Sequence, residues 1–212
     1  MATAAVAKGR SDALVFFGAT GDLAHKQIFP ALYAMTKRGV LDVPVVGVAH
    51  SGWSLAQLRD RAKDSIARST GGIDDTRALD RLLSRLGYVD GDYKHSGTFA
   101  ALKEALGKAS CPAHYLAIPP LLFATVIKEL GAAGLADKAR VIIEKHFGRE
   151  LASSLKLNQS AQAVFPDASL FRIDHFTGTA ACENLLYLRF DNSFREPHCT
   201  RDTYANGQST VS

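Results

Sequence analysis

The chain has 212 residues, of which 47% are hydrophobic, and its formal net charge is +4. This length suits one well-packed domain and part of a second. Acidic residues are interleaved with the basic ones, so there is no basic stripe of the kind that binds nucleic acid. The small excess of positive charge suits an anionic small ligand, although a solvated surface explains it equally well.

Cysteine usage and the N-terminus bear on the compartment. The three cysteines, Cys111, Cys182 and Cys199, are odd in number and show no close paired spacing. This pattern argues against a disulfide framework and against a metal site, and it favours a reducing cytoplasm. Residues 1–11 are expected to form a flexible arm without a signal peptide, and no apolar run is long enough to span a membrane. We therefore expect a cytoplasmic protein that has no membrane partner.

Buried strands and amphipathic helices alternate along the first half of the chain. Residues 13–18 and 43–49 are continuous apolar runs typical of buried strands, and a helix is predicted between them through 32–39. Ser54 is expected to cap the next helix. The later elements of this half are a short helix at 79–86, a strand at 87–93 and a helix marked by Phe99, Leu102 and Leu106.

The same alternation continues through three further strands. They are expected at 113–120, 139–145 and 169–174, with helices over about 120–134 and 149–165. Continuous apolar strands alternating with helices predict an α/β fold, a doubly wound, Rossmann-like and mostly parallel sheet that is covered on both faces. The expected domains are a coenzyme-binding domain at 12–176 and, at 177–212, only the start of a second α+β domain.

A glycine pattern follows the first strand and opens a helix, which is the context of a phosphate-binding loop. Gly18 suits a sharp turn and Gly21 suits close approach of backbone N–H groups to a pyrophosphate, while Ala24 allows tight packing of the helix on the strand. The predicted loop residues are Gly18, Ala19, Thr20, Gly21, Asp22 and Leu23. The alternative is that this segment is only a tight turn between strand and helix.

The end of the second strand indicates which dinucleotide is bound. An acid there favours NAD, whereas a cation favours the 2′-phosphate of NADP. The chain has His50 and Ser51 and no acid, which leans toward NADP. An exposed histidine that binds no ligand remains equally consistent. Tyr33 and Lys37 match the Tyr-x-x-x-Lys pattern of short-chain dehydrogenases, but they lie on the first helix beside the phosphate loop, so we expect Tyr33 to pack in the core.

Four ordered segments, "FFGATGDLAHKQIFPALY", "HYLAIPP", "VIIEKHFGRELASS" and "FRIDHFTG", resemble the coenzyme domain of the glucose-6-phosphate 1-dehydrogenase family. "GVAHSGW", "YVDGDY" and "ENLLYLRFDNSF" also fit, so the resemblance covers about residues 12–205. It implies an NADP-dependent oxidoreductase that converts glucose 6-phosphate to a lactone at the entry to the pentose phosphate pathway. Intact members of this family oligomerise through the second domain.

The resemblance also assigns roles to residues at the ends of the strands. The loop from Gly18 to Leu23 would cradle the pyrophosphate, and Glu144 would hold the nicotinamide carboxamide. Lys145 would reach both the coenzyme and the sugar. The remaining implied coenzyme residues are His50 at the 2′-phosphate, Asp92 and Tyr93 on the adenosine side, and Pro119 and Pro120 as a rigid turn.

The segment "FRIDHFTG" carries the implied substrate residues. His175 and Phe176 would bind the sugar phosphate. Asp174 would orient a catalytic histidine that accepts the C1 hydroxyl proton, and the resemblance places that histidine beyond residue 212. The phosphate and the dinucleotide are thus expected to be bound by this chain, while the proton acceptor is expected outside it.

The chain departs from the family pattern at several of these positions. A histidine replaces the proline that follows Lys145, another replaces the cation after the second strand, Phe176 replaces a tyrosine, and a threonine replaces a lysine three residues later. These departures are His146, His50, Phe176 and Thr179, and Gly207 and Ser209 occupy positions that are expected to be apolar. We therefore expect weak or no activity from the chain alone. The alternatives are a non-catalytic NADP-binding module and a decayed sequence.

Overall fold

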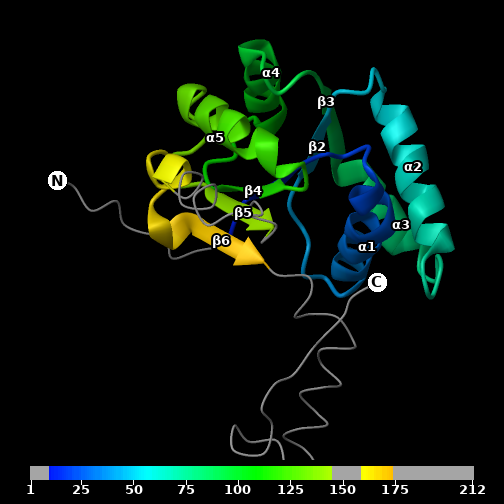
Figure 1. The fold of residues 1–212 in the computed structure, drawn as a ribbon. Coiled ribbons are helices and arrows are strands. Elements are labelled where there is room, and N and C mark those ends of the chain that lie inside the picture. Colours follow the sequence, from blue (N-terminus) through cyan, green and yellow to red (C-terminus); the bar gives the residue numbers. More distant parts are fainter. Residues whose placement is uncertain (1–9, 145–158, 174–212) are drawn as a thin grey trace, which may run out of the picture. The chain divides into compact units, whose positions relative to one another are not determined.

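The structure is a computed structural model that describes residues 10–144 and 159–173. These residues all lie in the unit Met1–Ile173, the first of two units into which the chain divides, and the second unit, Asp174–Ser212, lies outside the described residues. The described part is a sheet with helices on both of its faces (Figure 1).

Six strands form one sheet in the order β3-β2-β1-β4-β5-β6, and every neighbouring pair is parallel. Their bounds are β1 (Ala13–Phe17), β2 (Val45–Ala49), β3 (Leu86–Asp90), β4 (Pro112–Leu116), β5 (Arg140–Glu144) and β6 (Leu170–Ile173). The strand order reverses between β1 and β4, which is the point where doubly wound sheets bind ligands at the carboxyl ends of their strands. The predicted fold class is confirmed.

The helices divide into two groups that cover opposite faces of the sheet (Figure 1). Phe16 of β1 packs in the core that the first group covers, whereas its neighbour Phe17 packs in the core under the second group. This alternation follows from the two-residue period of a strand. The first group is η1 (Ala24–Ile28), α1 (Phe29–Lys37), α2 (Leu55–Arg68) and α3 (Thr76–Arg85), and the second is α4 (Ser96–Leu106) and α5 (Phe123–Ala132). Two short turns, η2 (Pro120–Leu122) and η3 (Asp167–Ser169), are also described.

Local signals set the helix boundaries. Ser54 caps α2 as predicted, because its hydroxyl accepts from the Gln57 N–H at 3.3 Å while the Gln57 side chain accepts from the Ser54 N–H at 2.8 Å. Proline opens η2, where its missing N–H costs nothing. The helix expected over 120–134 therefore begins as a single 3₁₀ turn and becomes α-helical only at Phe123.

Two predicted strands end earlier than expected. The strand expected at 87–93 ends at Asp90, because the carbonyl of Asp92 accepts hydrogen bonds from the His95 N–H at 3.1 Å and the Thr98 hydroxyl at 2.8 Å. These bonds turn the chain directly into α4. The strand expected at 113–120 likewise ends at Leu116.

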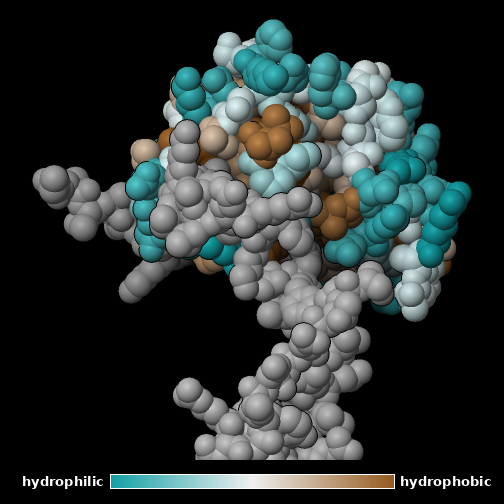
Figure 2. Space-filling model, in the orientation of Figure 1, coloured by the Kyte–Doolittle hydropathy of each residue, from teal (hydrophilic) through white to brown (hydrophobic). Residues whose placement is uncertain are grey.

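The last predicted helix is only partly described. Of residues 149–165, those at 149–158 lie outside the described residues, and 159–162 are helical. Within the two described ranges, no helix is both long and apolar enough to cross a membrane. On the side of the molecule that Figure 2 shows, the surface over α2 and α4 is mostly hydrophilic, with only scattered hydrophobic residues.

Candidate coenzyme site

The predicted coenzyme residues that the structure describes gather at one edge of the sheet. They follow the carboxyl ends of five parallel strands, β1 through β5, on both sides of the point where the strand order reverses. Lys145, Asp174, His175 and Phe176 lie outside the described residues, as do the departures at His146 and Thr179. The site is therefore built here from its dinucleotide side.

Gly18 makes the turn that the glycine pattern predicted. Its φ is +84°, and a Cβ atom at this position would lie only 2.1 Å from the carbonyl oxygen of Ala117. The Ala117 carbonyl belongs to the backbone and cannot move aside as a flexible side chain could. The left-handed conformation at Gly18 adds a further energetic penalty for any side chain. The end of β1 passes so close to the chain after β4 that only glycine fits.

The loop then delivers a helix N-terminus to the edge of the sheet. The Gly21 N–H donates to the Gly18 carbonyl at 3.0 Å, and the His25 N–H donates to the Gly21 carbonyl at 3.2 Å. Since this second bond is the first one of the helix, the N–H groups of residues 22–24 have no acceptor within it. Together with the helix dipole, such groups favour an anion. The loop from Gly18 to Leu23 thus leads into a helix N-terminus, and its binding of phosphate stays a prediction.

The first turn of this helix is clamped by α2, which the sequence did not indicate. Residues Ala24–Ile28 form a π-helical turn, an irregularity often found beside functional sites. Within this turn the His25 imidazole pairs with the Asp64 carboxylate at 3.0 Å, and the Ser65 hydroxyl donates to the His25 carbonyl. The Asp64 carboxyl has a lowered pKa, chiefly because of its hydrogen bond to His25.

Tyr93 lies beneath the loop. It is buried, with 8% of its surface exposed, and its hydroxyl accepts from the Gly18 N–H at 3.0 Å while it donates to the Val48 carbonyl at 3.1 Å. The Gly18 N–H also reaches the Val48 carbonyl directly, at 2.9 Å. Burial raises the pKa of the Tyr93 phenol, so it keeps its proton and can make both bonds. Tyr93 thereby ties the end of β1 to the end of β2.

Polar side chains connect the ends of β1, β2 and β3. The Thr20 and Ser51 hydroxyls lie 2.6 Å apart. The Asp90 carboxylate accepts from the N–H groups of Ser51 at 3.0 Å and Gly52 at 2.9 Å, and also from the Tyr88 hydroxyl at 2.8 Å. Sequence reasoning missed Asp90, although an acid as the last residue of a strand at the ligand-binding edge is a usable signal.

Asp92 and His50 lie close enough to interact electrostatically. Asp92 accepts from the Lys94 N–H at 2.9 Å, and His50 is exposed just after β2. The pKa of the Asp92 carboxyl is lowered, first by this hydrogen bond and then by the charges of His50, His95 and Lys94. The two predicted adenosine-side residues thus differ, since Asp92 faces polar surroundings and Tyr93 faces the core.

On the other side of the switch point, Glu144 ends β5. Its carboxylate accepts a hydrogen bond of 2.7 Å from the hydroxyl of Tyr115 on the neighbouring strand β4. Burial and this carboxylate both raise the pKa of Tyr115, so the phenol remains the donor. Pro119 and Pro120 follow β4, and the next residue, Leu121, is 93% exposed. Tyr115 is a second residue that sequence reasoning missed.

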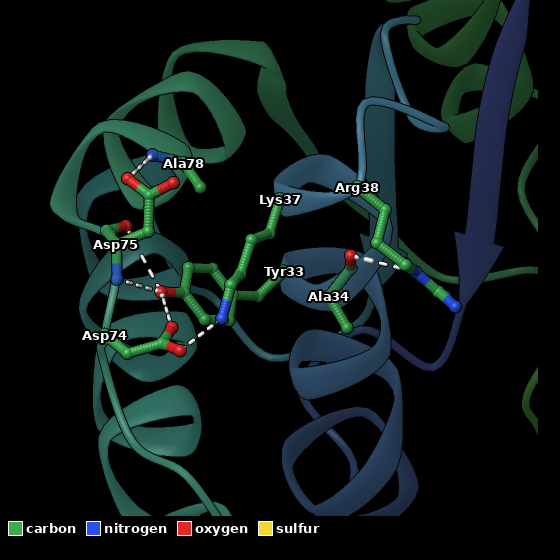
Figure 3. A network of polar contacts seen from close by, with 7 residues as sticks. All are labelled: Tyr33, Ala34, Lys37, Arg38, Asp74, Asp75 and Ala78. Atoms are coloured by element: carbon green, nitrogen blue, oxygen red, sulfur yellow. Dashed lines mark hydrogen bonds and ion pairs between the residues drawn. The ribbon is translucent and has the colours of Figure 1, made fainter.

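The Tyr-x-x-x-Lys pattern has a structural role, as expected (Figure 3). The Tyr33 hydroxyl donates to Asp74 at 2.8 Å and accepts from the Asp75 N–H at 2.7 Å, and Lys37 also pairs with Asp74. Asp75 in turn caps α3 by accepting from the Ala78 N–H at 2.9 Å. Tyr33 and Lys37 hold the start of α3 against α1. Tyr33 itself is buried, with 6% of its surface exposed.

Comparisons with known proteins agree with this geometry. The family profile described as "Glucose-6-phosphate dehydrogenase, NAD binding domain" matches residues 15–184. Glucose-6-phosphate 1-dehydrogenase 1 of Mycobacterium tuberculosis is 45% identical over 184 residues, which are 87% of this chain and 39% of that protein. The glucose-6-phosphate 1-dehydrogenase of Saccharomyces cerevisiae is 34% identical in an alignment that covers 91% of this chain and 40% of that protein.

Solved structures lead to the same family. The crystal structure of glucose-6-phosphate 1-dehydrogenase from Mycobacterium avium matches with a TM-score of 0.75 and 42% identity, over 91% of this chain and 43% of that chain. A glucose-6-phosphate dehydrogenase in complex with glucose 6-phosphate matches with a TM-score of 0.75 and 32% identity, over 92% of this chain and 43% of that one. The chain spans about two fifths of the length of these relatives. It belongs to the glucose-6-phosphate dehydrogenase family, and residues 15–184 correspond to the NAD-binding domain of that family.

Proposed function

We propose that this chain supplies the coenzyme-binding half of an NADP-linked glucose-6-phosphate dehydrogenase. The observation that carries the proposal is the loop from Gly18 to Leu23, which brings a helix N-terminus to the switch point of a parallel sheet. In this assignment the N–H groups of residues 22–24 bind the pyrophosphate. Bound NADP supplies the hydride acceptor for C1 of glucose 6-phosphate.

Other described residues have distinct roles in this proposal. Glu144, held by the Tyr115 hydroxyl at 2.7 Å, accepts from the nicotinamide carboxamide. Tyr93 acts from beneath the loop as a positioning residue, since its burial leaves the phenol facing the core. His50 and Asp92 face the ribose and adenine side, and Pro119 and Pro120 form a rigid wall beside the coenzyme.

The substrate residues remain proposals that rest on the family. Lys145, His175 and Phe176 are assigned to glucose 6-phosphate, and Asp174 is assigned to orient the catalytic histidine. Because the family resemblance places that histidine beyond residue 212, we expect these 212 residues alone to bind the dinucleotide without efficient turnover. The odd cysteine count favours the reducing cytoplasm as the location.

Calorimetry and a direct assay of NADPH formation test the proposal. NADP titrated into the purified 212-residue chain should bind at one site, and Glu144→Gln should weaken NADP more than 2′,5′-ADP, which lacks the nicotinamide. Production of NADPH from glucose 6-phosphate should stay far below that of an intact relative. Failure to bind NADP or NAD at millimolar concentration would contradict the proposal. Rapid turnover would contradict the expectation that the 212 residues bind the dinucleotide without efficient catalysis.

A further inference from the structure

The loop after β2 forms a small anion-binding nest. The consecutive N–H groups of Ser51 and Gly52 point to one oxygen of the Asp90 carboxylate, at 3.0 Å and 2.9 Å, and Gly52 has a φ of +66°. Successive backbone N–H groups around a left-handed residue make a concavity that favours negative charge. In this chain the anion in the nest is a side chain of the protein itself.

The same nest lies where a dinucleotide-binding fold distinguishes its two coenzymes. The residues after the second strand contact the adenosine ribose, whose 2′ position carries a hydroxyl in NAD and a phosphate in NADP. Ser51 is also bonded to Thr20 of the phosphate loop, at 2.6 Å between the hydroxyls, so the nest and the pyrophosphate site belong to one polar network. A charge in the nest would therefore lie close to the 2′ position of a dinucleotide bound at the site proposed above.

The position after β2 also holds no permanent cation that would offset the negative charge of Asp90. His50 stands after β2 where the family resemblance implies arginine or lysine, and an imidazole, which carries no permanent charge, is a poorer partner for phosphate than a guanidinium. The donors of Ser51 and Gly52, which could bind a phosphate, are already used by Asp90. The Tyr88 hydroxyl, at 2.8 Å, fixes the carboxylate in this position.

We propose that Asp90 is a coenzyme-specificity residue, whose carboxylate occupies the donors of Ser51 and Gly52 and thereby lowers the preference for NADP over NAD. The proposal rests on the coenzyme site proposed above. It implies that the 2′-phosphate of NADP must compete with the Asp90 carboxylate for the N–H groups of Ser51 and Gly52. The 2′-hydroxyl of NAD avoids this competition, because it can either accept or donate a hydrogen bond at the nest. The reduced preference for NADP over NAD thus comes from an acid on β3 and not from the loop after β2.

Asp90→Asn removes the charge and keeps an oxygen that can accept from both N–H groups. The measured quantity is the ratio of the dissociation constants of NAD and NADP, by calorimetry in a phosphate-free buffer of fixed ionic strength. The ratio should rise by about fivefold in favour of NADP, the size expected for one screened surface charge against a dianion. Asp137→Asn is the matched control, because it removes the same charge from an exposed residue before β5, at the opposite edge of the sheet, and it should leave the ratio unchanged.

The outcomes separate the two proposals. If wild type binds both coenzymes and Asp90→Asn leaves their ratio unchanged, or if Asp137→Asn shifts it equally, the assignment of Asp90 is overturned and the coenzyme site stands. If wild type binds neither coenzyme, the proposed function fails, and the assignment of Asp90 fails with it. Thermal melting verifies that each variant is folded, and Asp90→Ser serves in its place should Asp90→Asn not fold.

Discussion

The Tyr93 hydroxyl accepts a hydrogen bond of 3.0 Å from the backbone N–H of Gly18, across 75 positions of the chain. The same hydroxyl donates to the Val48 carbonyl at 3.1 Å, so one buried phenol fixes the first residue of the phosphate loop against the end of β2. A loop that is held before the coenzyme arrives loses less conformational entropy on binding. Tyr93 therefore connects the packing of the core with the affinity of the site.

Tyr93→Phe tests this connection. The ring stays in the core and only the hydroxyl is lost, so we expect NADP affinity to fall by about fivefold, equivalent to about 1 kcal/mol, the usual net worth of one hydrogen bond. Calorimetric titration of NADP measures the change. Tyr33→Phe removes a buried hydroxyl elsewhere and is the matched control, and an equal loss of affinity in both variants would contradict the positioning role.

Gly18→Ala should prevent the loop from forming. The added Cβ would meet the Ala117 carbonyl at 2.1 Å, so we expect the free energy of unfolding to fall by about 3 kcal/mol or more, through backbone strain and overpacking. Gly39→Ala is the control, because Gly39 has a similar φ of +70° with nothing within 4 Å of its Cβ position. Its cost should be about 1 kcal/mol, from the left-handed conformation alone. Urea denaturation that gave equal costs for both variants would exclude the close contact with Ala117.

The network of Figure 3 should affect stability but not binding. Tyr33→Phe leaves the Asp75 N–H without the acceptor that it has at 2.7 Å, and we expect a loss of about 1–2 kcal/mol in the free energy of unfolding. Lys37→Met removes a pair in which both side chains are about half exposed, and its cost should stay below about 1 kcal/mol. A change in NADP affinity beyond twofold in either variant would show that the pattern acts at the coenzyme site.

The buried side chain of His114 should make the free energy of unfolding depend on pH. It is fully buried on β4, and burial lowers its pKa from 6.5 to about 4, although its Nε2 contacts the Leu135 carbonyl at 2.9 Å. The histidine of the unfolded chain takes up a proton below about pH 6.5, whereas that of the folded chain does so only near pH 4. Stability is therefore complete above pH 6.5 and declines as the pH falls toward 4, by about 3 kcal/mol in total.

Denaturant titrations at several pH values between 7 and 4 measure this decline. His114→Leu removes the titrating group, and its stability should fall much less over the same range, whatever its stability at neutral pH. The carboxyls of Asp64, Asp74, Asp90 and Asp92 have pKa values lowered from 3.8, so the stability that they contribute is present above about pH 5 and is lost as the pH falls through their lowered pKa values, mostly below this range. A wild-type slope that His114→Leu preserves would assign the effect to other groups.

The sheet and the phosphate loop could be predicted because their signals are local. Buried parallel strands are continuous apolar runs such as residues 45–49, every one of which is buried. Gly18 and Gly21 stand directly between a strand and a helix, so their roles follow from neighbouring residues. The Ser54 cap is likewise contained within four positions of the chain.

The connections among strand ends could not be predicted in the same way. Asp90 bonds to Ser51 across 39 positions, and Tyr115 bonds to Glu144 across 29, so both pairs depend on the strand register. The burial of Tyr93 depends on where β3 ends. The sequence placed that end three residues too late, because the prediction ran through Asp90-Gly91, a pair typical of turns, into the turn that Asp92 makes with His95 and Thr98.

Backbone hydrogen exchange with and without NADP tests the central claim most directly. The account predicts slower exchange at residues 20–24 and at 51–53 when NADP is added to the 212-residue chain, with no change at 74–78, where the network of Figure 3 lies. Binding that left residues 20–24 unprotected would contradict the account, as would protection confined to the helices away from the carboxyl edge of the sheet.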